Sequence, residues 1–370
     1  MVSEGWSSLP GHGGVFVHER TKAIMIVYVD DMLLLATVKD TRLHWRTLER
    51  RIDYKDPEQG LSRYLGARYS FTDVDGKNLD GARELLTDMD NYIASAVSKF
   101  ESEYNGKLGK ATSPYLSSEE IAKVGEFPGS FSEKCSSHVA TLLFASRVAR
   151  PDISTAVQRL CRVVSKWSTT HDSMLVRVFA YLKSTGPISL TAALAKTDLQ
   201  HCKLVLWSDA DLAGDPEDSK STSGMFIELV SEESGHRWPL TWAVRRQGAT
   251  AGSTCEAETV ALCSAVKQDG IPLCELLDFM IMKSRRPIEL VCRVDNTQCL
   301  AAVRRGYSKK LRFLERTQRI AIGSVHELLE RDEIVVEYWN TDTHRGDSFT
   351  KCLIPVKFLA ARELMGMRTR

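Results

Sequence analysis

The chain has 370 residues, of which 43% are hydrophobic and 26% charged, and its formal net charge is +1. This length and composition are typical of a soluble globular protein with two or three domains. Because the charges nearly cancel, a uniformly basic nucleic-acid-binding protein is excluded, and any such surface must be local.

Cysteine spacing, hydropathy and the N-terminal sequence disfavour three further classes of protein. The nine cysteines are scattered and form no C-x-x-C pair, which argues against a structural zinc site and for reduced thiols. No apolar run reaches the ~18 residues that a membrane span needs. The N-terminus also lacks the charged and apolar regions of a signal peptide.

Residues 23–36, AIMIVYVDDMLLLA, predict two apolar strands joined at Asp30 and Asp31. Two adjacent carboxylates inside an apolar segment conflict with burial, so we expect them at a tight hairpin turn that faces a cation. A surface hairpin with a polar turn is the alternative.

The following segments alternate between helix and strand patterns. Residues 40–52 have the spacing of a solvated amphipathic helix, and residues 61–71 that of a strand. Residues 84–104 predict a core-facing helix whose apolar stripe contains Leu85, Met89 and Ile93. Residues 105–114 form a loop rich in Gly, Lys, Ser and Pro, which we take as a boundary.

Between residues 131 and 185 the pattern is mainly helical. Helices are predicted at residues 138–147, 153–167 and 174–182, with Pro151 placed as the first residue of a helix. The basic residues of this part could contact phosphates, although a solvated helix face is the alternative for each of Arg147, Arg150 and Lys183.

An apolar run at residues 204–207 predicts a buried strand that delivers Asp209 where the apolar pattern stops. Residues 225–230 and 237–242 predict two further strands, antiparallel neighbours of the first. Ser253 then begins a helix. Three strands followed by a helix let that helix lie across the sheet and bring one of its glutamates near Asp209.

Neighbouring carboxylates offer two choices. Glu256 and Glu258 point about 200° apart on a helix, so only one of them can face the site. Glu256 is typical of a first-turn glutamate favoured by the helix dipole, which leaves Glu258 as the candidate. Asp211 follows Asp209 by two residues and is more typical of a loop cap.

Two more carboxylates stand at strand ends. Asp295 follows an apolar strand at residues 290–294, and Asp347 follows a last strand at residues 333–339. Two divalent ions roughly 4 Å apart, held by such carboxylates, activate water and stabilise the leaving oxygen in phosphodiester hydrolysis. We expect the four candidates to converge on one sheet edge: Asp209, Glu258, Asp295 and Asp347.

Residues 304–319 carry the strongest charge bias of this part, with seven Lys or Arg against one Glu. Such a strip can neutralise phosphates, and its interleaved Tyr307 and Phe313 offer surface for sugars or bases. A solvated basic helix is the alternative. The candidate nucleic-acid-binding residues are Arg304, Arg305, Lys309, Lys310, Arg312, Arg316 and Arg319.

Six motifs follow one another between residues 207 and 351. They are WSDADLAGD (207–215), KSTSG (220–224), WAVRRQ (242–247), STCEAET (253–259), VDN (294–296) and GDSFTK (346–351). In this order they resemble the ribonuclease H domain of copia-type LTR retrotransposons, whose equivalents read approximately SDADWAGD, KSTSG, W-x-x-x-x-Q, SSTEAEY, DN and AD-x-x-TK. The chain departs from the family at Thr259, at Gly346 and at residues 318–321, where the family usually has Lys-His-Ile-Asp.

The resemblance implies a ribonuclease H fold with Asp209, Glu258, Asp295 and Asp347 as its metal ligands. His344, three residues before Asp347, could assist product release or proton transfer, and a capping role is the alternative. RPDIS (150–154) and YLKSTG (181–186) resemble signatures of the thumb and connection in the same family.

Tyr28-Val29-Asp30-Asp31 resembles the reverse-transcriptase hairpin, whose aspartates hold two magnesium ions. In that family a third aspartate lies on an earlier strand. Only 27 residues precede Tyr28 here, and none of them is an Asp. We therefore expect no DNA polymerisation by this chain. Incorporation of deoxynucleotides that Asp30→Ala abolishes would contradict this expectation.

The predicted fold is α/β (α+β), with a partial polymerase palm hairpin, a helical thumb and connection, and a ribonuclease H-like mixed five-stranded sheet with helices. The predicted parts are residues 1–110, 111–200 and 201–370.

The predicted function is that of a truncated reverse transcriptase/ribonuclease H. The C-terminal part is expected to hydrolyse RNA in RNA·DNA hybrids with two Mg²⁺ or Mn²⁺ ions. An inactive nucleic-acid-binding relic is the alternative. The absent targeting signals and the resemblance imply an intracellular location, in the cytoplasm or nucleus, without membrane contact.

Overall fold

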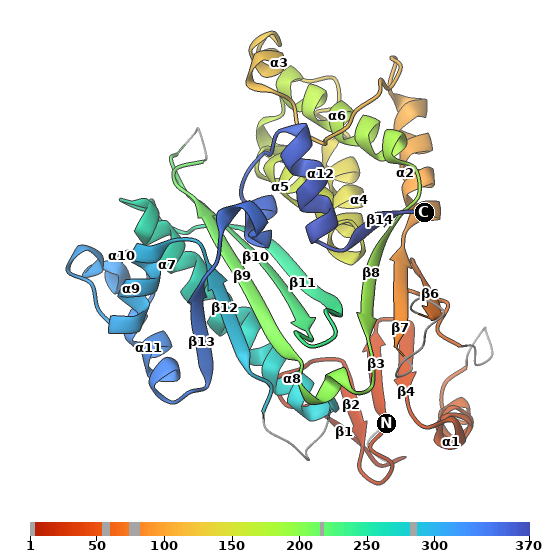
Figure 1. Ribbon diagram of the computed structural model, residues 1–370. Coiled ribbons are helices and arrows are strands. Elements are labelled where there is room, and N and C mark those ends of the chain that lie inside the picture. The colour runs from red at the N-terminus through yellow and green to blue at the C-terminus, as the bar shows by residue number, and fades with distance from the viewer. Residues whose placement is uncertain (1–3, 54–59, 74–81, 215–217, 282–286) are drawn as a thin grey trace. The chain divides into compact units, whose positions relative to one another are not determined.

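The computed structural model describes residues 4–53, 60–73, 82–214, 218–281 and 287–370, and the chain divides into two compact units, Met1–Ser70 and Phe71–Arg370 (Figure 1). Helices and sheets together confirm the predicted mixed α/β class. Within the described ranges, no helix combines the length and apolar character needed to cross a bilayer. The predicted division into three parts stays a prediction.

The first unit contains an antiparallel four-stranded sheet in the order β1-β2-β3-β4. Its elements are β1 (Trp6–Ser8), β2 (Val15–His18), β3 (Ile24–Tyr28), β4 (Asp31–Leu35) and helix α1 (Val38–Glu49). Trp6, Met25 and Leu48 are buried in its core. Helix α1 confirms the helix predicted at residues 40–52, and the Thr37 side chain begins it by accepting a hydrogen bond from the Asp40 N–H.

The predicted hairpin at residues 23–36 is present. Tyr28 pairs with Asp31, which leaves Val29 and Asp30 as the turn. Val29 has a φ of 55°, the left-handed conformation that such two-residue turns favour. Asp30 and Asp31 are exposed, and neither forms an ion pair with a described residue. Because no described basic side chain pairs with these carboxylates, a cation that binds them would come from solvent.

The single strand predicted at residues 61–71 is a hairpin instead. β5 (Arg63–Tyr64) pairs antiparallel with β6 (Ala67–Asp73), and Leu65 and Gly66 form the turn, with φ of 48° and 73°. This hairpin belongs to a five-stranded sheet in the order β14 (Met367–Thr369), β8 (Ile188–Leu194), β7 (Arg83–Asp88), β6 and β5.

The helix predicted at residues 84–104 is wrong at its beginning. β7 (Arg83–Asp88) is a strand that pairs with β8 (Ile188–Leu194), and α2 (Asp90–Glu103) begins after it. Leu85 and Met89 are both buried, and their spacing of four residues suits a helix. Long-range pairing with β8, which local spacing does not reveal, places Leu85 in a strand instead.

The last residues of the chain form a helix and a strand. After helix α12 (Pro355–Leu364), β14 (Met367–Thr369) pairs antiparallel with β8. The Thr191 N–H and hydroxyl both donate to the Gly366 carbonyl, at 2.8 and 2.7 Å.

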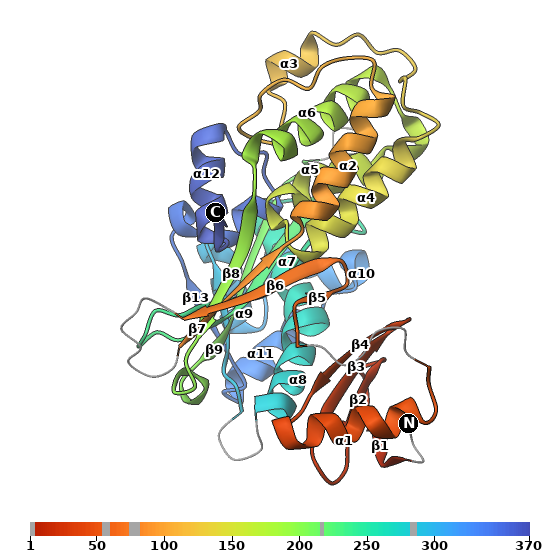
Figure 2. The same ribbon diagram turned by 90° about the vertical axis from the view of Figure 1, so that its right-hand side faces the viewer.

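Helices gather at one end of the second unit (Figure 1, Figure 2). They are α2, α3 (Ser118–Ala122), α4 (Cys135–Val148), η2 (Pro151–Ile153), α5 (Ser154–Arg162), η3 (Val164–Lys166) and α6 (Thr169–Thr185). These elements confirm the three predicted helical segments and the position of Pro151 at a helix start.

Two of the basic residues named in this helical part, Arg150 and Lys183, have partners within the protein, whereas Arg147 is exposed. Arg150 is only 1% exposed and donates to both oxygens of Asp152, at 2.9 and 2.7 Å. Tyr181 donates to the same carboxylate at 2.6 Å. Lys183 pairs with Glu101 at 2.6 Å. Both the possible phosphate contact and the solvated helix face are therefore wrong for Arg150, which forms a buried ion pair.

The main sheet of the second unit has five strands in the order β11-β10-β9-β12-β13. They are β9 (Lys203–Asp211), β10 (Thr222–Val230), β11 (Arg237–Arg246), β12 (Leu290–Val294) and β13 (Ile334–Tyr338). The first three strands are antiparallel neighbours, whereas β12 runs parallel to β9 and β13. This is the predicted mixed five-stranded sheet.

Side chains alternate between the two faces of this sheet. On one face Leu206, Ile227 and Cys292 pack under helices, with α7 (Thr254–Ala265) lying across β9 and β10. On the other face Trp207 and Phe226 pack against the C-terminal segment. The remaining elements are η4 (Asp198–Gln200), α7 (Thr254–Ala265), the π-turn η5 (Val266–Gly270), α8 (Ile271–Ile281), α9 (Thr297–Arg305), η6 (Lys309–Leu311), α10 (Leu314–Gln318), α11 (Ile322–Glu330), η7 (Thr341–Thr343) and η8 (Arg345–Phe349).

Candidate functional site

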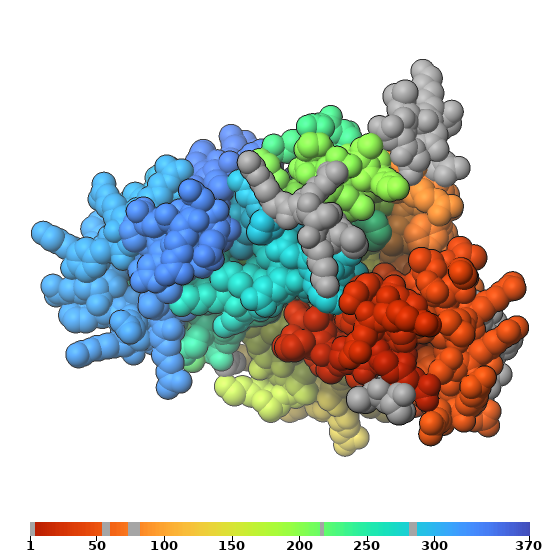
Figure 3. Space-filling view, turned by 90° about the horizontal axis from the view of Figure 1, so that it is seen from below, coloured from red at the N-terminus to blue at the C-terminus, as the bar shows by residue number. Residues whose placement is uncertain are grey.

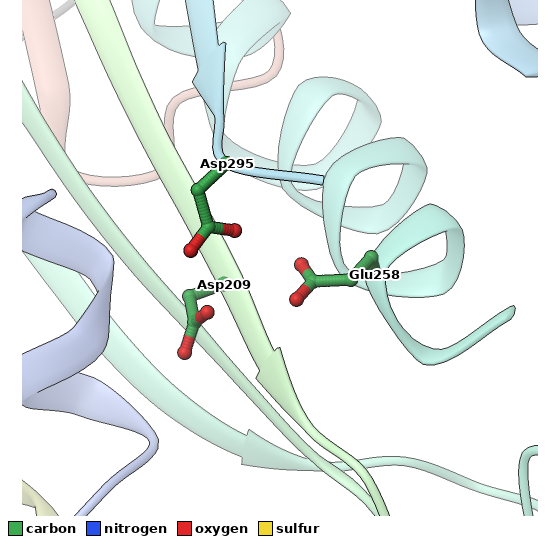
Figure 4. A group of neighbouring side chains, drawn as sticks. All are labelled: Asp209, Glu258 and Asp295. Carbon is green, nitrogen blue, oxygen red and sulfur yellow. The ribbon is translucent and has the colours of Figure 1, made fainter. Parts of the chain in front are cut away.

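Three of the predicted carboxylates converge at one edge of the main sheet. Asp209 lies near the end of β9, Asp295 follows β12, and Glu258 projects from α7 (Figure 4). One carboxylate oxygen from each lies within 4.8 Å of the others. Because β9 and β12 are parallel neighbours, their carboxyl ends meet at the same edge, and α7 brings Glu258 to it.

Burial makes this cluster costly without a cation. Asp209 is 1% exposed and Glu258 3%. Burial, together with the charges of Asp209 and Asp295, raises the pKa of Glu258 to about 9. The buried Oε2 of Glu258 has no hydrogen-bond partner. An all-oxygen, strongly anionic donor set with an unpartnered oxygen fits Mg²⁺ or Mn²⁺.

Asp347 is not part of this group of three. It lies in η8, and the Lys351 ammonium stands 2.7 Å from Asp347 Oδ1 and 3.3 Å from Asp209 Oδ1. Burial and the Asp209 charge raise the pKa of Asp347 to about 6, against the effect of Lys351. The fourth predicted ligand is thus linked to Asp209 through a lysine.

Sequence reasoning missed Lys351 and Thr350. Burial opposes the charge of Lys351, but Asp209 and Asp347 raise its pKa above the usual value, so it remains an ammonium ion. The Thr350 hydroxyl donates to Asp209 Oδ2. The sequence signal for these two residues was the Thr-Lys pair of the last motif. Lys351 follows Asp347 by four residues, a spacing that one helical turn brings into contact.

Glycines allow the C-terminal segment to approach β9 and β10. A Cβ on Gly346 would lie 2.9 Å from Asp209 Cβ and 2.7 Å from His344 Cε1. Gly224, which pairs with Asp209 in the sheet, would place a Cβ 2.7 Å from Phe349 Cβ. Gly346, one of the departures from the family pattern, is therefore the residue that this close packing requires.

A buried ionic network around Glu228 holds the C-terminal segment that carries Asp347. Glu228 is 0% exposed and accepts a hydrogen bond from Trp207 Nε1 at 2.8 Å. Arg237 and Arg345 both pair with this carboxylate, Arg345 at 2.9 Å. Arg345 immediately precedes Gly346, so this pair fixes the backbone from which Asp347 projects.

His344 has a structural role. Its Nδ1 accepts a hydrogen bond from the Gly346 N–H at 3.2 Å, and its Nε2 lies 3.1 Å from the Arg293 carbonyl. The ring is 3% exposed and contacts Trp207 edge to face. Both nitrogens are engaged, which favours the capping alternative over proton transfer.

The neighbouring carboxylates also have local partners. Asp211 accepts a hydrogen bond from the Thr222 N–H, across from it on β10. Glu256 accepts one from the Gly252 N–H at 2.9 Å, beside the Ser253 cap of α7. Both structural alternatives are thus supported. Asp215, the last residue of its motif, lies outside the described residues.

The predicted basic strip runs over the end of α9, η6 and α10. In Figure 3 the light-blue atoms of this part of the chain form an outer surface with projecting side chains. Tyr307 and Phe313 are 58% and 56% exposed. Arg312 stacks over the Phe313 ring at 4.6 Å, and Arg304 donates to the Val336 carbonyl at 3.0 Å. None of its seven basic residues forms an ion pair with a described residue.

Comparisons with known proteins give the following similarities. The chain is 29% identical over 305 residues to the retrovirus-related Pol polyprotein from transposon RE1 of Arabidopsis thaliana, covering 79% of this chain and 18% of that protein. It is 25% identical over 361 residues to the corresponding polyprotein from transposon TNT 1-94 of Nicotiana tabacum, covering 95% and 25%. The chain therefore spans a quarter or less of these relatives.

Two other similarities are more limited, and no family model matches the chain. Secreted RxLR effector protein 161 of Plasmopara viticola is 36% identical over 132 residues, which cover 36% of this chain and 86% of that protein. The crystal structure of RNase H1 from Halobacterium salinarum NRC-1 shares 12% identity over 40% of this chain and 94% of that one, with a TM-score of 0.28.

Proposed function

Because the chain belongs to the family of copia-type retrotransposon Pol polyproteins, we propose that its second unit is a ribonuclease H-like nuclease that hydrolyses the RNA strand of RNA·DNA hybrids. The observation that carries this proposal is the convergence of Asp209, Glu258 and Asp295. These side chains are far apart in the sequence and meet at one sheet edge.

The sheet topology supports the same proposal. Three antiparallel strands are followed by a helix that lies across them and by two parallel strands. This is the mixed sheet that the ribonuclease H resemblance implies. In this sheet β9 and β12 end side by side, and Asp209 and Asp295 lie at these two strand ends.

Asp209, Glu258 and Asp295 would hold the divalent ion. When bound, that ion supplies Lewis-acid activation of water and stabilises charge on the phosphate. Glu258 has an oxygen free to bind it, and Asp295 is oriented by the Thr341 hydroxyl, which donates to Oδ2 at 2.9 Å. Thr350 fixes the rotation of the Asp209 carboxylate in the same way.

The basic strip would bind the hybrid. Its exposed ammonium and guanidinium groups neutralise phosphates, and Tyr307 and Phe313 offer rings to sugars or bases. RNA and DNA backbones both satisfy these contacts, so the strip supplies affinity and the carboxylate site supplies chemistry.

Cleavage of an end-labelled RNA·DNA hybrid with Mn²⁺ or Mg²⁺ tests the proposal. We expect Asp209→Asn to lower the cleavage rate at least about 100-fold, because it removes a ligand charge at the reacting centre. Glu330→Gln, an exposed substitution on α11, is the matched control and should cleave normally. Hybrid binding by the folded protein without any cleavage would contradict the enzyme and support the inactive relic.

A further inference from the structure

The motif WAVRRQ (242–247) ends in a buried glutamine that has no role in the proposed function so far. Gln247 directly follows β11 and is 5% exposed. Its backbone N–H donates to the Ser221 carbonyl at 2.8 Å, which extends the pairing of β11 with the beginning of β10 by one residue. The Gln247 side chain therefore projects from a backbone position that the sheet fixes.

The side-chain amide of Gln247 links this sheet to helix α7. Its Nε2 donates to the Ala257 carbonyl at 2.9 Å and to the Ser223 hydroxyl oxygen at 3.0 Å. Ala257 is buried and immediately precedes Glu258 on α7. Gln247 thus holds the helix by the peptide group that joins Ala257 to Glu258.

Small side chains bring α7 close to strand β9 at the same place. Four alanines from β9, from α7 and from the loop before α7 are buried together, namely Ala210, Ala251, Ala257 and Ala261. Apolar contacts have no preferred direction, so they set how near the helix lies but resist sliding only weakly. A hydrogen bond needs a defined distance and angle, so the bond from Gln247 fixes α7 along its own axis.

The carboxylate cluster depends on this axial position. One oxygen of Glu258 lies within 4.8 Å of oxygens of Asp209 and Asp295, which stand on β9 and after β12. A slide of α7 by the rise of one residue would move Glu258 by about 1.5 Å relative to these strands. Bonds to Mg²⁺ are about 2.1 Å long and demand near-ideal geometry, so such a slide would remove a ligand.

The second oxygen of the cluster's helper argues against a purely stabilising role for Gln247. Its Oε1 is buried and has no hydrogen-bond partner among the described residues. An unpaired buried acceptor destabilises the folded state, which offsets the gain from the two bonds that Nε2 donates. Gln247 therefore adds little net stability, and its bonds matter chiefly for where α7 lies.

We propose that Gln247 is a positioning residue that holds α7 so that the Glu258 carboxylate faces Asp209 and Asp295. The proposal rests on the proposed function in one respect, that the carboxylate cluster binds a divalent ion. Gln247 acts through Glu258 and is not a ligand. Partners that orient metal ligands in this way commonly change ion affinity by about 10- to 100-fold.

The Mn²⁺ affinity of the full chain tests this role without any cleavage assay. Titration followed by Mn²⁺ paramagnetic resonance gives the dissociation constant. Gln247→Met is similar in size but cannot donate, and it should raise this constant at least about 10-fold. Gln247→Asn keeps an amide that is one methylene too short to reach Ala257, and it should raise the constant similarly. Ser223→Ala leaves the bond to α7 intact and should keep the wild-type constant.

The control is Gln268→Met on η5, where the glutamine is exposed on the continuation of α7. It should bind Mn²⁺ as the wild type does. Circular dichroism confirms that each variant is folded. Wild-type affinity in folded Gln247→Met or Gln247→Asn would overturn the positioning role and leave the nuclease proposal standing, even if these variants unfold more easily. No Mn²⁺ binding by the folded wild type would overturn both proposals.

Discussion

Gly346 shows how much a single side chain decides at this site. The segment that carries Asp347 passes so close to β9 that an added methyl group would touch Asp209 and His344. Its neighbours Phe349 and Thr350 make equally close contacts with Gly224. The carboxylates can approach one another only because two positions in this layer lack a Cβ.

Gly346→Ala should therefore destabilise the protein by about 1 to 3 kcal/mol, the usual cost of overpacking a filled site. Chemical denaturation measures the free energy of unfolding. Gly323→Ala on α11 is the matched control, because nothing lies within 4 Å of the new Cβ, and it should cause no loss. Equal stability of the two variants would contradict the close packing around Gly346.

The buried Glu258 predicts a pH dependence of stability in the absence of divalent ions. Burial, with the charges of Asp209 and Asp295, raises its pKa from 4.5 to about 9. At a pH between these two pKa values, Glu258 keeps a proton in the folded state that it releases in the unfolded chain. The free energy of unfolding should therefore fall as pH rises from about 5 to about 9, with a slope approaching about 1.4 kcal/mol per pH unit.

Denaturation in a chelating buffer at several pH values measures this slope. Glu258→Gln cannot lose the proton and should reduce the slope, while Glu330→Gln should keep it. Asp347, whose pKa is raised to about 6, contributes in the same direction at lower pH. Identical slopes for the wild type and Glu258→Gln would show that Glu258 is ionised in the folded chain.

At the scale of elements, two segments of the second unit differ in how they are held. The η8 turn is anchored by Arg345 on Glu228, and the chain then continues through α12 to β14, which pairs with β8. The basic strip is organised differently, because its side chains lie on the short elements that end α9 and surround η6. One segment orients ligands, and the other presents charge to solvent.

Salt dependence tests the basic strip. Replacing Arg305, Lys309 and Lys310 by Ala should weaken hybrid binding, because fewer counterions are then released. Each lost phosphate contact should reduce the slope of log affinity against log salt by about 0.9. Lys107→Ala, in the exposed loop after α2, is the control and should keep the wild-type slope. A slope unchanged by the triple substitution would remove this strip from the binding surface.

At the scale of the whole molecule, all four predicted ligands belong to the second unit, Phe71–Arg370. The exposed aspartates of the hairpin belong to the first unit. A divalent ion at the carboxylate cluster should therefore stabilise the second unit specifically, since it binds side chains that only that fold brings together.

Calorimetry with added Mn²⁺ measures this stabilisation. At an ion concentration of about 100 times the dissociation constant, binding to the folded state adds about 2.7 kcal/mol, which raises Tm by several degrees. Asp295→Asn should reduce the rise, whereas the exposed Asp332→Asn should not. A rise that Asp295→Asn leaves intact would place the bound ion elsewhere.

Much of this arrangement follows from the sequence itself. An apolar run that stops before a carboxylate marks a strand end, which placed Asp209 and Asp295 at strand ends. That these two strands are parallel neighbours is a feature of the structure. The helix dipole and the 3.6-residue period separated Glu258 from Glu256 without any coordinates. Local patterns sufficed here because each residue's role depends on its own element.

Only the tertiary structure decided the rest. Leu85 lies in a strand because β8 pairs with it, and the last residues form β14 for the same reason. Lys351 comes between Asp209 and Asp347 because Gly224 and Gly346 let a distant segment pack against β9 and β10. These contacts join residues more than one hundred positions apart, and no spacing within a single element encodes them.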